Sequence, residues 1–284
     1  MAMMPGEKPP VAVVKVGGDV LLDEEEKSGL AKNIRSLTEN GWRVVLLHGG
    51  GPQTNRLQEI YGLKPNKVGG RRITSPADLR VVKQAIAGEV NVDLVSALLA
   101  AGVPAFGCHG ASGRLIEAVK RPPRVVSGAG PEPVDFGEVG DVVRINGALL
   151  NALLDAGVVP VIATLGVGED GRIFNINADT TVVQIAKTLK ADLLLLTTKI
   201  GGIFRDLDDP SSRIAEITPA EAKSLIDAGV IAGGMIPKVE EAISLLDEGV
   251  GAIAIVGARD GKAFLSVARG EGAVGTRIWK GEAA

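Results

Sequence analysis

Residues 43–56, RVVLLHGGGPQTNR, are the stretch that most clearly indicates the fold of this chain. Residues 44–47 form a short apolar run of strand type, and the glycines that follow His48 end it abruptly. Pro52 suits the first turn of a helix, where a missing N–H group costs nothing. A strand, three glycines and a helix start expose backbone N–H groups at a positive dipole end, which predicts an anion site. The alternative is a tight turn without a ligand, for which one glycine would suffice.

Composition narrows the class of protein. A chain of 284 residues fits one large α/β domain or two closely merged lobes. Hydrophobic residues make up 45% but aromatic residues only 3%, so Val, Ile, Leu and Ala must fill the core, as in parallel sheets flanked by helices. The net charge of -3 and the absence of a basic run argue against a nucleic-acid partner.

A single cysteine, Cys108, excludes an intrachain disulfide and a cysteine-rich metal site, and it favours the reducing cytoplasm. Residues 1–10 lack the apolar segment of a signal peptide and are expected to be a disordered lead. No apolar run approaches membrane-spanning length, so we expect no membrane partner.

Strands and helices are expected to alternate along the chain. Three helix ends carry a glycine directly before a strand, at Gly102, Gly157 and Gly249, which is typical of the junctions in a parallel sheet. The expected strands are 11–16, 44–47, 103–107, 158–163, 191–197, 251–256 and 276–279, and the expected helices are 24–39, 52–61, 76–100, 147–156, 180–189, 218–228 and 233–248. Pieces at 115–119 and 139–145 predict β-hairpins that project from the sheet, and VGGRRIT at 68–74 is expected to be a basic loop.

Several polar residues stand at positions that invite a ligand. Lys15 is at the carboxyl end of the first strand, where ligands of open α/β sheets bind, although a lysine there can also simply extend its amine to water. Lys238 lies in the first turn of a helix, where a cation opposes the dipole unless an anion binds. Asp179 is either a functional carboxylate or a plain helix N-cap.

Together with the glycines, Arg72 and Asn175, these groups are mostly cations and amide donors, and no general base accompanies them. The set suits phosphoryl transfer, which depends on positioning and on neutralising charge. A carboxylate acceptor would already be a nucleophile. Two lysines could then bracket the transferring group, with Asp179 holding both amines.

Five segments in order along nearly the whole chain resemble the amino acid kinase family, and within it the members that act on N-acetyl-L-glutamate. They are VVKVGG at 13–18, HGGGPQTN at 48–55, GGRRIT at 69–74, NINAD at 175–179 and GGMIPKV at 233–239. The resemblance implies an α/β fold, a three-layer αβα sandwich with a central, mainly parallel sheet. It also implies one domain over 1–284, with an acyl-substrate lobe at about 11–175 and an ATP-binding lobe at about 176–284.

The resemblance also implies a role for each matching residue. Lys15 and Lys238 would stabilise the transition state and Asp179 would orient them. Gly50 and Gly51 would donate backbone N–H groups, Arg72 would hold the α-carboxylate of the acceptor, and Asn175 would contact its acetylamino end. The implied nucleotide contacts are Gly18, Thr198, Lys199, Gly202, Gly234, Met235 and Lys238.

The implied reaction is phosphorylation of the γ-carboxylate of N-acetyl-L-glutamate by ATP in arginine biosynthesis. Mg²⁺ would be held mainly by the phosphates, so no protein residue is assigned as a metal ligand. The sequence departs from the family at Lys199, where an aspartate is common, and near Gly257, where a histidine and an aspartate are common. Hexameric, arginine-inhibited members have a longer N-terminal helix, so we expect a homodimer without arginine feedback.

Three other functions remain to be weighed. An HGGG segment also occurs in α/β hydrolases, but this chain has no GxSxG nucleophile motif. A carboxylate kinase of the same fold that acts on carrier-bound aminoadipate or glutamate is a closer alternative, although its glycine loop commonly lacks the third glycine. A non-catalytic amino-acid sensor is the third, and it would not need Lys15, Lys238 and Asp179.

Overall fold

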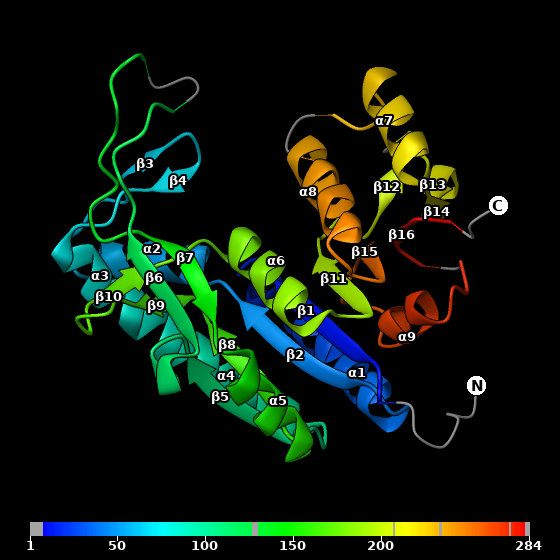
Figure 1. The fold of residues 1–284 in the computed structure, drawn as a ribbon, viewed down its shortest axis with the longest axis horizontal. Coiled ribbons are helices and arrows are strands. Elements are labelled where there is room, and N and C mark those ends of the chain that lie inside the picture. The colour runs from blue at the N-terminus through cyan, green and yellow to red at the C-terminus, as the bar shows by residue number, and fades with distance from the viewer. Residues whose placement is uncertain (1–7, 127–129, 207, 233–234, 273, 282–284) are drawn as a thin grey trace.

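A computed structural model describes residues 8–126, 130–206, 208–232, 235–272 and 274–281, and its centre is an eight-stranded sheet (Figure 1). All of its strands run parallel except β14 and β16, so the expected mainly parallel sheet is confirmed. In spatial order the strands are β14 (Glu216–Ile217), β16 (Thr276–Trp279), β15 (Ala252–Val256), β11 (Leu193–Thr197), β1 (Val11–Val16), β2 (Arg43–His48), β8 (Val159–Ala163) and β5 (Ala105–His109).

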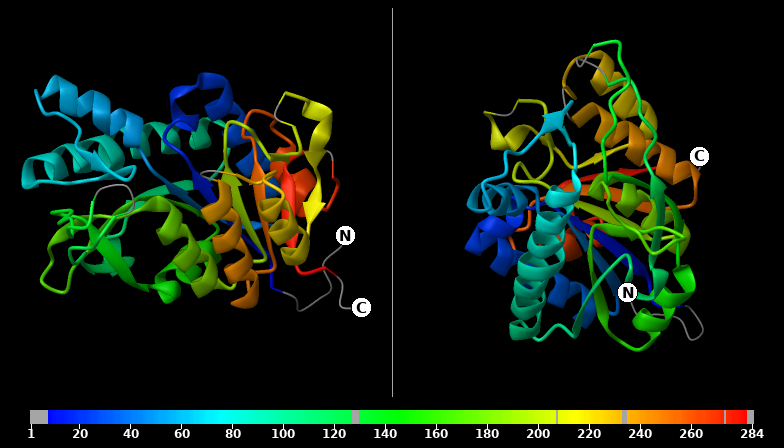
Figure 2. Two further views of the ribbon diagram at one scale, coloured as in Figure 1. Left: turned by 90° about the horizontal axis from the view of Figure 1, so that it is seen from above. Right: turned by 90° about the vertical axis from the view of Figure 1, so that its left-hand side faces the viewer.

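Helices cover both faces of this sheet and make the three layers of the sandwich (Figure 2). Side chains alternate between the faces: Val13 joins one hydrophobic cluster and Val14 the other. One cluster contains residues from α1 (Glu24–Glu39), α4 (Asn91–Ala100) and α9 (Ala263–Ala268), and the other contains residues from α5 (Gly147–Asp155), α6 (Ala178–Leu189), α7 (Pro219–Asp227) and α8 (Met235–Asp247). None of the described helices combines the length and the apolar character that a membrane crossing requires.

Residues 51–175 add smaller elements beside the carboxyl edge of the sheet. Helix α2 (Gly51–Ile60) follows β2, and the strands β3 (Lys67–Val68) and β4 (Arg71–Arg72) form a short antiparallel hairpin. Helix α3 (Pro76–Val82) continues without a break through the π-helical segment η2 (Lys83–Val90) into α4. A four-stranded sheet combines β10 (Ile173–Asn175), β9 (Leu165–Val167), β6 (Ile116–Lys120) and β7 (Gly140–Ile145).

The second half carries a short pair of strands, β12 (Ile203–Phe204) and β13 (Arg213–Ile214). Single 3-10 turns occupy η1 (Val20–Leu22), η3 (Ser112–Arg114) and η4 (Pro210–Ser212). In Figure 1 the β3–β4 hairpin and α2 lie at one end of the molecule, α7 and α8 lie at the other, and α6 lies between them.

Much of the expected pattern is confirmed. The strand 11–16, the helix 24–39 and the strand 276–279 have the predicted bounds. The glycines at the three junctions have φ values of 82°, 76° and 95° at Gly102, Gly157 and Gly249, as helix-terminating glycines should. Strands β6 and β7 pair antiparallel, as expected for a hairpin.

One open alternative is resolved and two expectations need correction. Of the two interpretations of Asp179, the N-cap is excluded, because the side chain of Asn177 accepts from the Thr180 N–H group and Asp179 lies in the first turn of α6. The basic stretch 68–74 is not a plain loop, since Arg71 and Arg72 form the strand β4. The strand expected at 103–107 runs over Ala105–His109 instead, and it lies at an edge of the sheet.

Candidate active site

Strand β2 and helix α2 hold the glycine loop, which we define as Gly49–Gly51. The strand is buried from Val44 to His48, so the core fixes where the loop begins. Pro52 lies in the first turn of α2 as expected, and Gly50 is the residue before the helix. The loop therefore lies at the carboxyl edge of the parallel strands, with the positive end of a helix dipole behind it.

The glycines of this loop are not required by the turn itself. None of the three has a φ in the left-handed region that favours glycine, since the φ of Gly50, 179°, is that of extended backbone. A Cβ added at Gly51 would meet nothing within 4 Å, and one at Gly49 would only touch Ala178 Cβ at 4.0 Å. Only at Gly50 would an added Cβ be closely packed, 3.1 Å from Ile86 Cγ1. The tight-turn interpretation thus leaves Gly49 and Gly51 unexplained, whereas space for a ligand explains them.

A cavity of about 180 Å³ joins this loop to residues from distant parts of the chain. Its walls include the three glycines, Arg72 from β4 and Asn175 from the end of β10. Asn175 is held there because its Nδ2 donates to Oγ1 of the buried Thr74, at 3.1 Å. The structure thus brings together the glycine loop and the two residues expected to bind an acceptor.

Arg72 is anchored to the helix that the glycine loop starts. Its guanidinium donates to Oε1 of Gln58, to Oδ1 of Asn55 and, at 3.3 Å, to the carbonyl of Gly51. Burial lowers the pKa of the Arg72 guanidinium, and the Asp78 carboxylate acts in the opposite direction. An arginine stays protonated in either case, so the cavity wall carries a fixed positive charge.

Lys15 and Asp179 form an ion pair beside this cavity. Lys15 Nζ lies 3.0 Å from Asp179 Oδ1, and the lysine side chain is only 14% exposed. In the sheet Lys15 is the register partner of Leu47, one residue before His48, so it reaches the same edge as the glycine loop. Asp179 directly follows Asn177 and Ala178, which line the cavity. The expected contact between Lys15 and Asp179 is therefore present.

The nucleotide-side residues expected from the sequence are more scattered. Gly18 packs against the first turn of α2, because its added Cβ would lie 2.9 Å from Pro52 Cδ and 3.0 Å from Gly50 Cα. Thr198 follows β11 and its Oγ1 accepts from Gly201 N at 3.0 Å. Lys199 lines a different cavity, of about 490 Å³, together with Glu26 of α1 and its N-cap, Asp23.

Three residues expected to contact the nucleotide lie on helix α8 or just before it. Gly234 lies outside the described residues, as do the side chains of Met235 and Lys238. The backbone positions of Met235 and Lys238 are in the first turn of α8, as expected.

Two features of the site were missed by sequence reasoning. Arg121 lines the cavity, is 6% exposed and pairs with Asp141 at 2.7 Å. No local signal marks it, because Asp141 lies 20 residues further along the chain, on β7. Asn55 and Gln58, by contrast, stand four and seven residues after Gly51, on one helical face, and that spacing could have predicted that they face the loop.

Histidine does not supply acid–base chemistry at the glycine loop. His48 is fully buried, and burial lowers the pKa of its imidazole to about 4. The ring is therefore neutral at pH 7 and is screened from any ligand.

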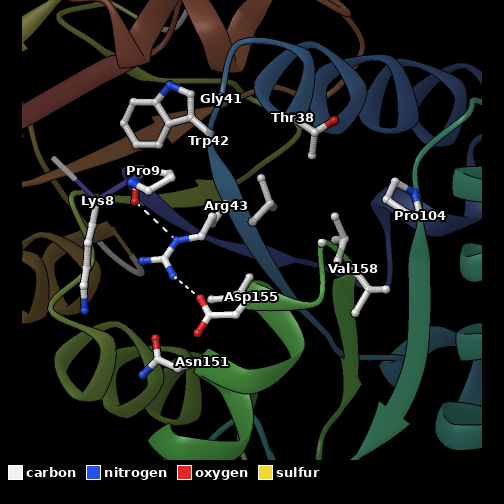
Figure 3. A pocket seen from close by; sticks show the side chains of 14 residues that line it. Lys8, Pro9, Thr38, Gly41, Trp42, Arg43, Pro104, Asn151, Asp155 and Val158 are labelled. Atoms are coloured by element: carbon white, nitrogen blue, oxygen red, sulfur yellow. Dashed lines mark hydrogen bonds and ion pairs between the residues drawn. The ribbon is translucent and has the colours of Figure 1, made fainter. Parts of the chain in front are cut away.

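A larger cavity, of about 680 Å³, lies at the opposite edge of the sheet (Figure 3). Arg43 begins β2 there and binds the Pro9 carbonyl at 3.3 Å and Asp155 Oδ1 at 3.1 Å. These contacts fasten the start of β2 to the end of α5. Because ligands of open α/β sheets bind at the carboxyl ends of strands, the smaller cavity is the candidate active site.

The chain is similar to known proteins over most of its length. Residues 10–257 match the sequence model of the amino acid kinase family. Similar proteins include acetylglutamate kinases from Anaeromyxobacter sp. (49% identity over 86% of this chain and 90% of the relative) and Methanocaldococcus jannaschii (38% over 94% and 90%).

Solved structures with a similar fold include an N-acetylglutamate synthase from Neisseria gonorrhoeae complexed with coenzyme A and N-acetyl-glutamate, with a TM-score of 0.78 and 27% identity over 98% of this chain. This chain spans 61% of that synthase's length. A carbamate kinase from Giardia matches with a TM-score of 0.67 and 19% identity over 96% of this chain and 100% of its own, which bears on the fold alone.

Proposed function

Because this chain belongs to the amino acid kinase family, we propose that it transfers the γ-phosphoryl group of ATP to the γ-carboxylate of N-acetyl-L-glutamate, giving N-acetyl-L-glutamyl 5-phosphate in arginine biosynthesis. The observation that carries this proposal is the cavity shared by the glycine loop, Arg72 and Asn175. A guanidinium, an amide and bare backbone N–H groups around one small cavity match an acceptor with two carboxylates and an amide.

Each group has a chemical task in this proposal. Arg72 binds the α-carboxylate, because a guanidinium can grip two oxygens at once, and Asn175 binds the acetylamino end. The γ-carboxylate is ionised at neutral pH, so it attacks without a general base. Gly50 and Gly51 donate N–H groups to the transferring phosphoryl group and to the acceptor.

The proposed role of the two lysines is electrostatic. Lys15 and Lys238 stabilise the negative charge that spreads over the oxygens of the phosphoryl group in the transition state. Asp179 holds the Lys15 amine in place through the ion pair at 3.0 Å. The placement of Lys15 at the edge of the sheet that bears the glycine loop supports this role.

ATP is proposed to bind the lobe at about 176–284, and the acyl substrate the lobe at about 11–175. Gly18, Thr198, Lys199, Gly202, Gly234 and Met235 are the proposed nucleotide contacts. Within the described residues no three His, Cys, Asp or Glu side chains gather as a metal site. Amines and amides suit phosphates rather than Mg²⁺, so we assign the magnesium to the phosphates of ATP, where it neutralises their charge.

We also propose a cytoplasmic homodimer. Strand β5 is an edge of the central sheet, and Phe106 on it is 46% exposed. Beside it, Val92 and Leu99 of α4 stand seven residues apart on one helical face and are 61% and 54% exposed. An apolar, unpaired edge of this kind favours pairing with a second copy. The single buried cysteine suits a reducing compartment.

A coupled assay for ADP release tests the proposed reaction. N-acetyl-L-glutamate, glutamate, aspartate and aminoadipate serve as acceptors, with hydroxylamine to trap an acyl phosphate. We expect ADP and a hydroxamate with N-acetyl-L-glutamate above all others. A preference for aminoadipate would favour the related carboxylate kinase, and no ADP with any acceptor would favour the sensor.

A further inference from the structure

The hydrogen bonds of buried His48 have only one consistent arrangement. Its Nδ1 lies 2.9 Å from the carbonyl oxygen of Gly49, and its Nε2 lies 2.9 Å from Nδ2 of Asn91. A carbonyl only accepts, so Nδ1 carries the proton. Asn91 Nδ2 also donates to the Val161 carbonyl at 2.9 Å, which fixes the orientation of the amide. Nε2 is therefore the acceptor, and Asn91 sets the tautomer of the ring.

This arrangement determines where one N–H group of the glycine loop points. In a trans peptide the C=O and N–H bonds point in opposite directions. With the Gly49 carbonyl held toward His48, the N–H of Gly50 is turned away from the core. Gly50 also lines the candidate active-site cavity.

The peptide between Gly50 and Gly51 is likewise held by hydrogen bonds to its carbonyl. The Gly50 carbonyl accepts from the N–H of Thr54 at 2.8 Å and from its Oγ1 at 2.7 Å. The N–H of Gly51 is thereby turned away from α2. Across the part of the chain that the structure describes, no protein acceptor takes the N–H of either glycine.

The π-helical segment η2, directly before Asn91, packs against the glycine loop. Ile86 and Val90 of the π-helical segment η2 lie 3.1 and 3.4 Å from the point where a Gly50 Cβ would be. π-Helical turns often mark functional sites. Here the wider turn puts two apolar side chains against the loop and, directly after them, the amide that bonds His48.

We propose that His48, Thr54 and Asn91 are positioning residues: they fix the two peptide planes of the glycine loop, so that the Gly50 and Gly51 N–H groups point into the cavity before an anion arrives. Glycines have no side chains to hold them, so the orientation of these peptides depends on bonds to their carbonyls. The expected effect on the reaction rate rests on the proposed function, whereas the expected effect on anion binding is independent of it.

The rate experiment compares two amide replacements of one residue. In His48→Asn the new amide nitrogen lies close to the former Nδ1 and can still donate to Gly49. In His48→Gln it lies close to the former Nε2 and cannot. We expect His48→Gln to lower kcat by about 100-fold, the typical effect of losing one oriented donor, with little change in KM for ATP. We expect His48→Asn to stay within about tenfold of the native kcat.

A second pair of variants provides a matched control. Thr54 and Thr188 each bond the carbonyl four residues earlier, Thr188 Oγ1 to Gln184 O at 2.7 Å near the end of α6, away from the cavity. Replacing either by valine removes one such bond. Only Thr54→Val is expected to lower kcat, by a few-fold, because the Thr54 N–H still holds Gly50.

An anion titration tests the orientation without any turnover. Protein labelled with ¹⁵N-glycine is titrated with inorganic phosphate, and the amide signals of Gly50 and Gly51 are followed by NMR. We expect both signals to shift in the native chain and in His48→Asn, and to shift little in His48→Gln. If His48→Gln does not fold, Asn91→Ala takes its place, with a smaller loss of the phosphate-dependent shift.

Equal kcat in His48→Asn and His48→Gln, or equal phosphate-dependent shifts, would overturn the positioning role. A native chain that releases no ADP with N-acetyl-L-glutamate, yet shows the phosphate-dependent shifts, would overturn the proposed function and leave the positioning role supported.

Discussion

Two glycine-containing loops follow strands of the same sheet, and their glycines exist for different reasons. The glycine loop after β2 has ordinary φ values and open space beside Gly51. The loop after β11 contains Gly201, whose φ is +75°, and Gly202, whose added Cβ would lie 3.2 Å from both Arg213 and Thr276. The second loop needs glycine to fold, whereas Gly49 and Gly51 of the first do not. The comparison indicates that those two glycines are there for a ligand.

The largest effect is expected from the charge beside the glycine loop. Lys15→Met should lower kcat by about 1,000-fold or more, because the lysine acts on transition-state charge, while far-UV circular dichroism remains native. Steady-state kinetics on the purified variant checks this, with Lys187→Met as the control, since Lys187 pairs with Glu248 elsewhere. Near-normal turnover in Lys15→Met would remove this lysine from the mechanism.

The two loops can be compared by one glycine-to-alanine substitution in each. Gly51→Ala should lower kcat/KM by about 100-fold, because the methyl group enters the space of the phosphoryl group, and should leave stability unchanged or raise it by up to ~1 kcal/mol. Gly201→Ala should instead cost about 1–2 kcal/mol of unfolding free energy, because alanine is strained at this φ. Urea denaturation and initial rates measure both. Full activity in Gly51→Ala would restore the interpretation as a plain turn.

A smaller effect is expected at the acceptor end of the cavity. Arg72→Lys should raise KM for N-acetyl-L-glutamate by about tenfold with kcat changed less, because the bidentate grip is lost. The control is Arg35→Lys, because Arg35 lies on α1, pairs with Glu39 at 2.7 Å and does not line the cavity. An unchanged KM in Arg72→Lys would separate this residue from acceptor binding.

The smallest expected effect is on the free energy of unfolding, through the protonation of His48. His48 has a folded-state pKa of about 4, below its ordinary 6.5, so between these values the unfolded chain binds more protons. Stability should therefore fall as the pH drops from 6.5 toward 4, by as much as ~3 kcal/mol from this group. Unfolding free energies of the native chain and His48→Asn, measured across that range, should converge toward low pH. A constant difference between them would contradict the neutral, buried imidazole.

How far the sequence predicts this structure depends on the range of the interactions. The strand 11–16 and the helix 24–39 were predictable because an apolar run and local capping define them, and Asp23 accepts from two N–H groups at the helix start. Asp179 was open to misassignment because Asn177, two residues earlier, is also a good cap. Arg71 and Arg72 form a strand only because they pair with Lys67 and Val68.

The candidate site follows the same rule. Lys15, Arg72, Asn175 and the glycine loop belong to recognisable local motifs. The bond from Asn91 to His48 spans 43 residues, and Arg121 pairs with Asp141 on β7. No local sequence pattern predicts either contact. These contacts exist only once the sheet and η2 have brought the segments together.

The central claim is that the glycine-loop N–H groups and the Lys15 amine meet at the transferring phosphoryl group. A crystal structure of the protein with ADP, Mg²⁺, N-acetyl-L-glutamate and aluminium fluoride, a mimic of that group, tests it most directly. We predict the aluminium fluoride within hydrogen-bonding distance of the N–H groups of Gly50 and Gly51 and of Lys15 Nζ. Aluminium fluoride bound at Gly201 and Gly202, with the glycine loop empty, would contradict the account.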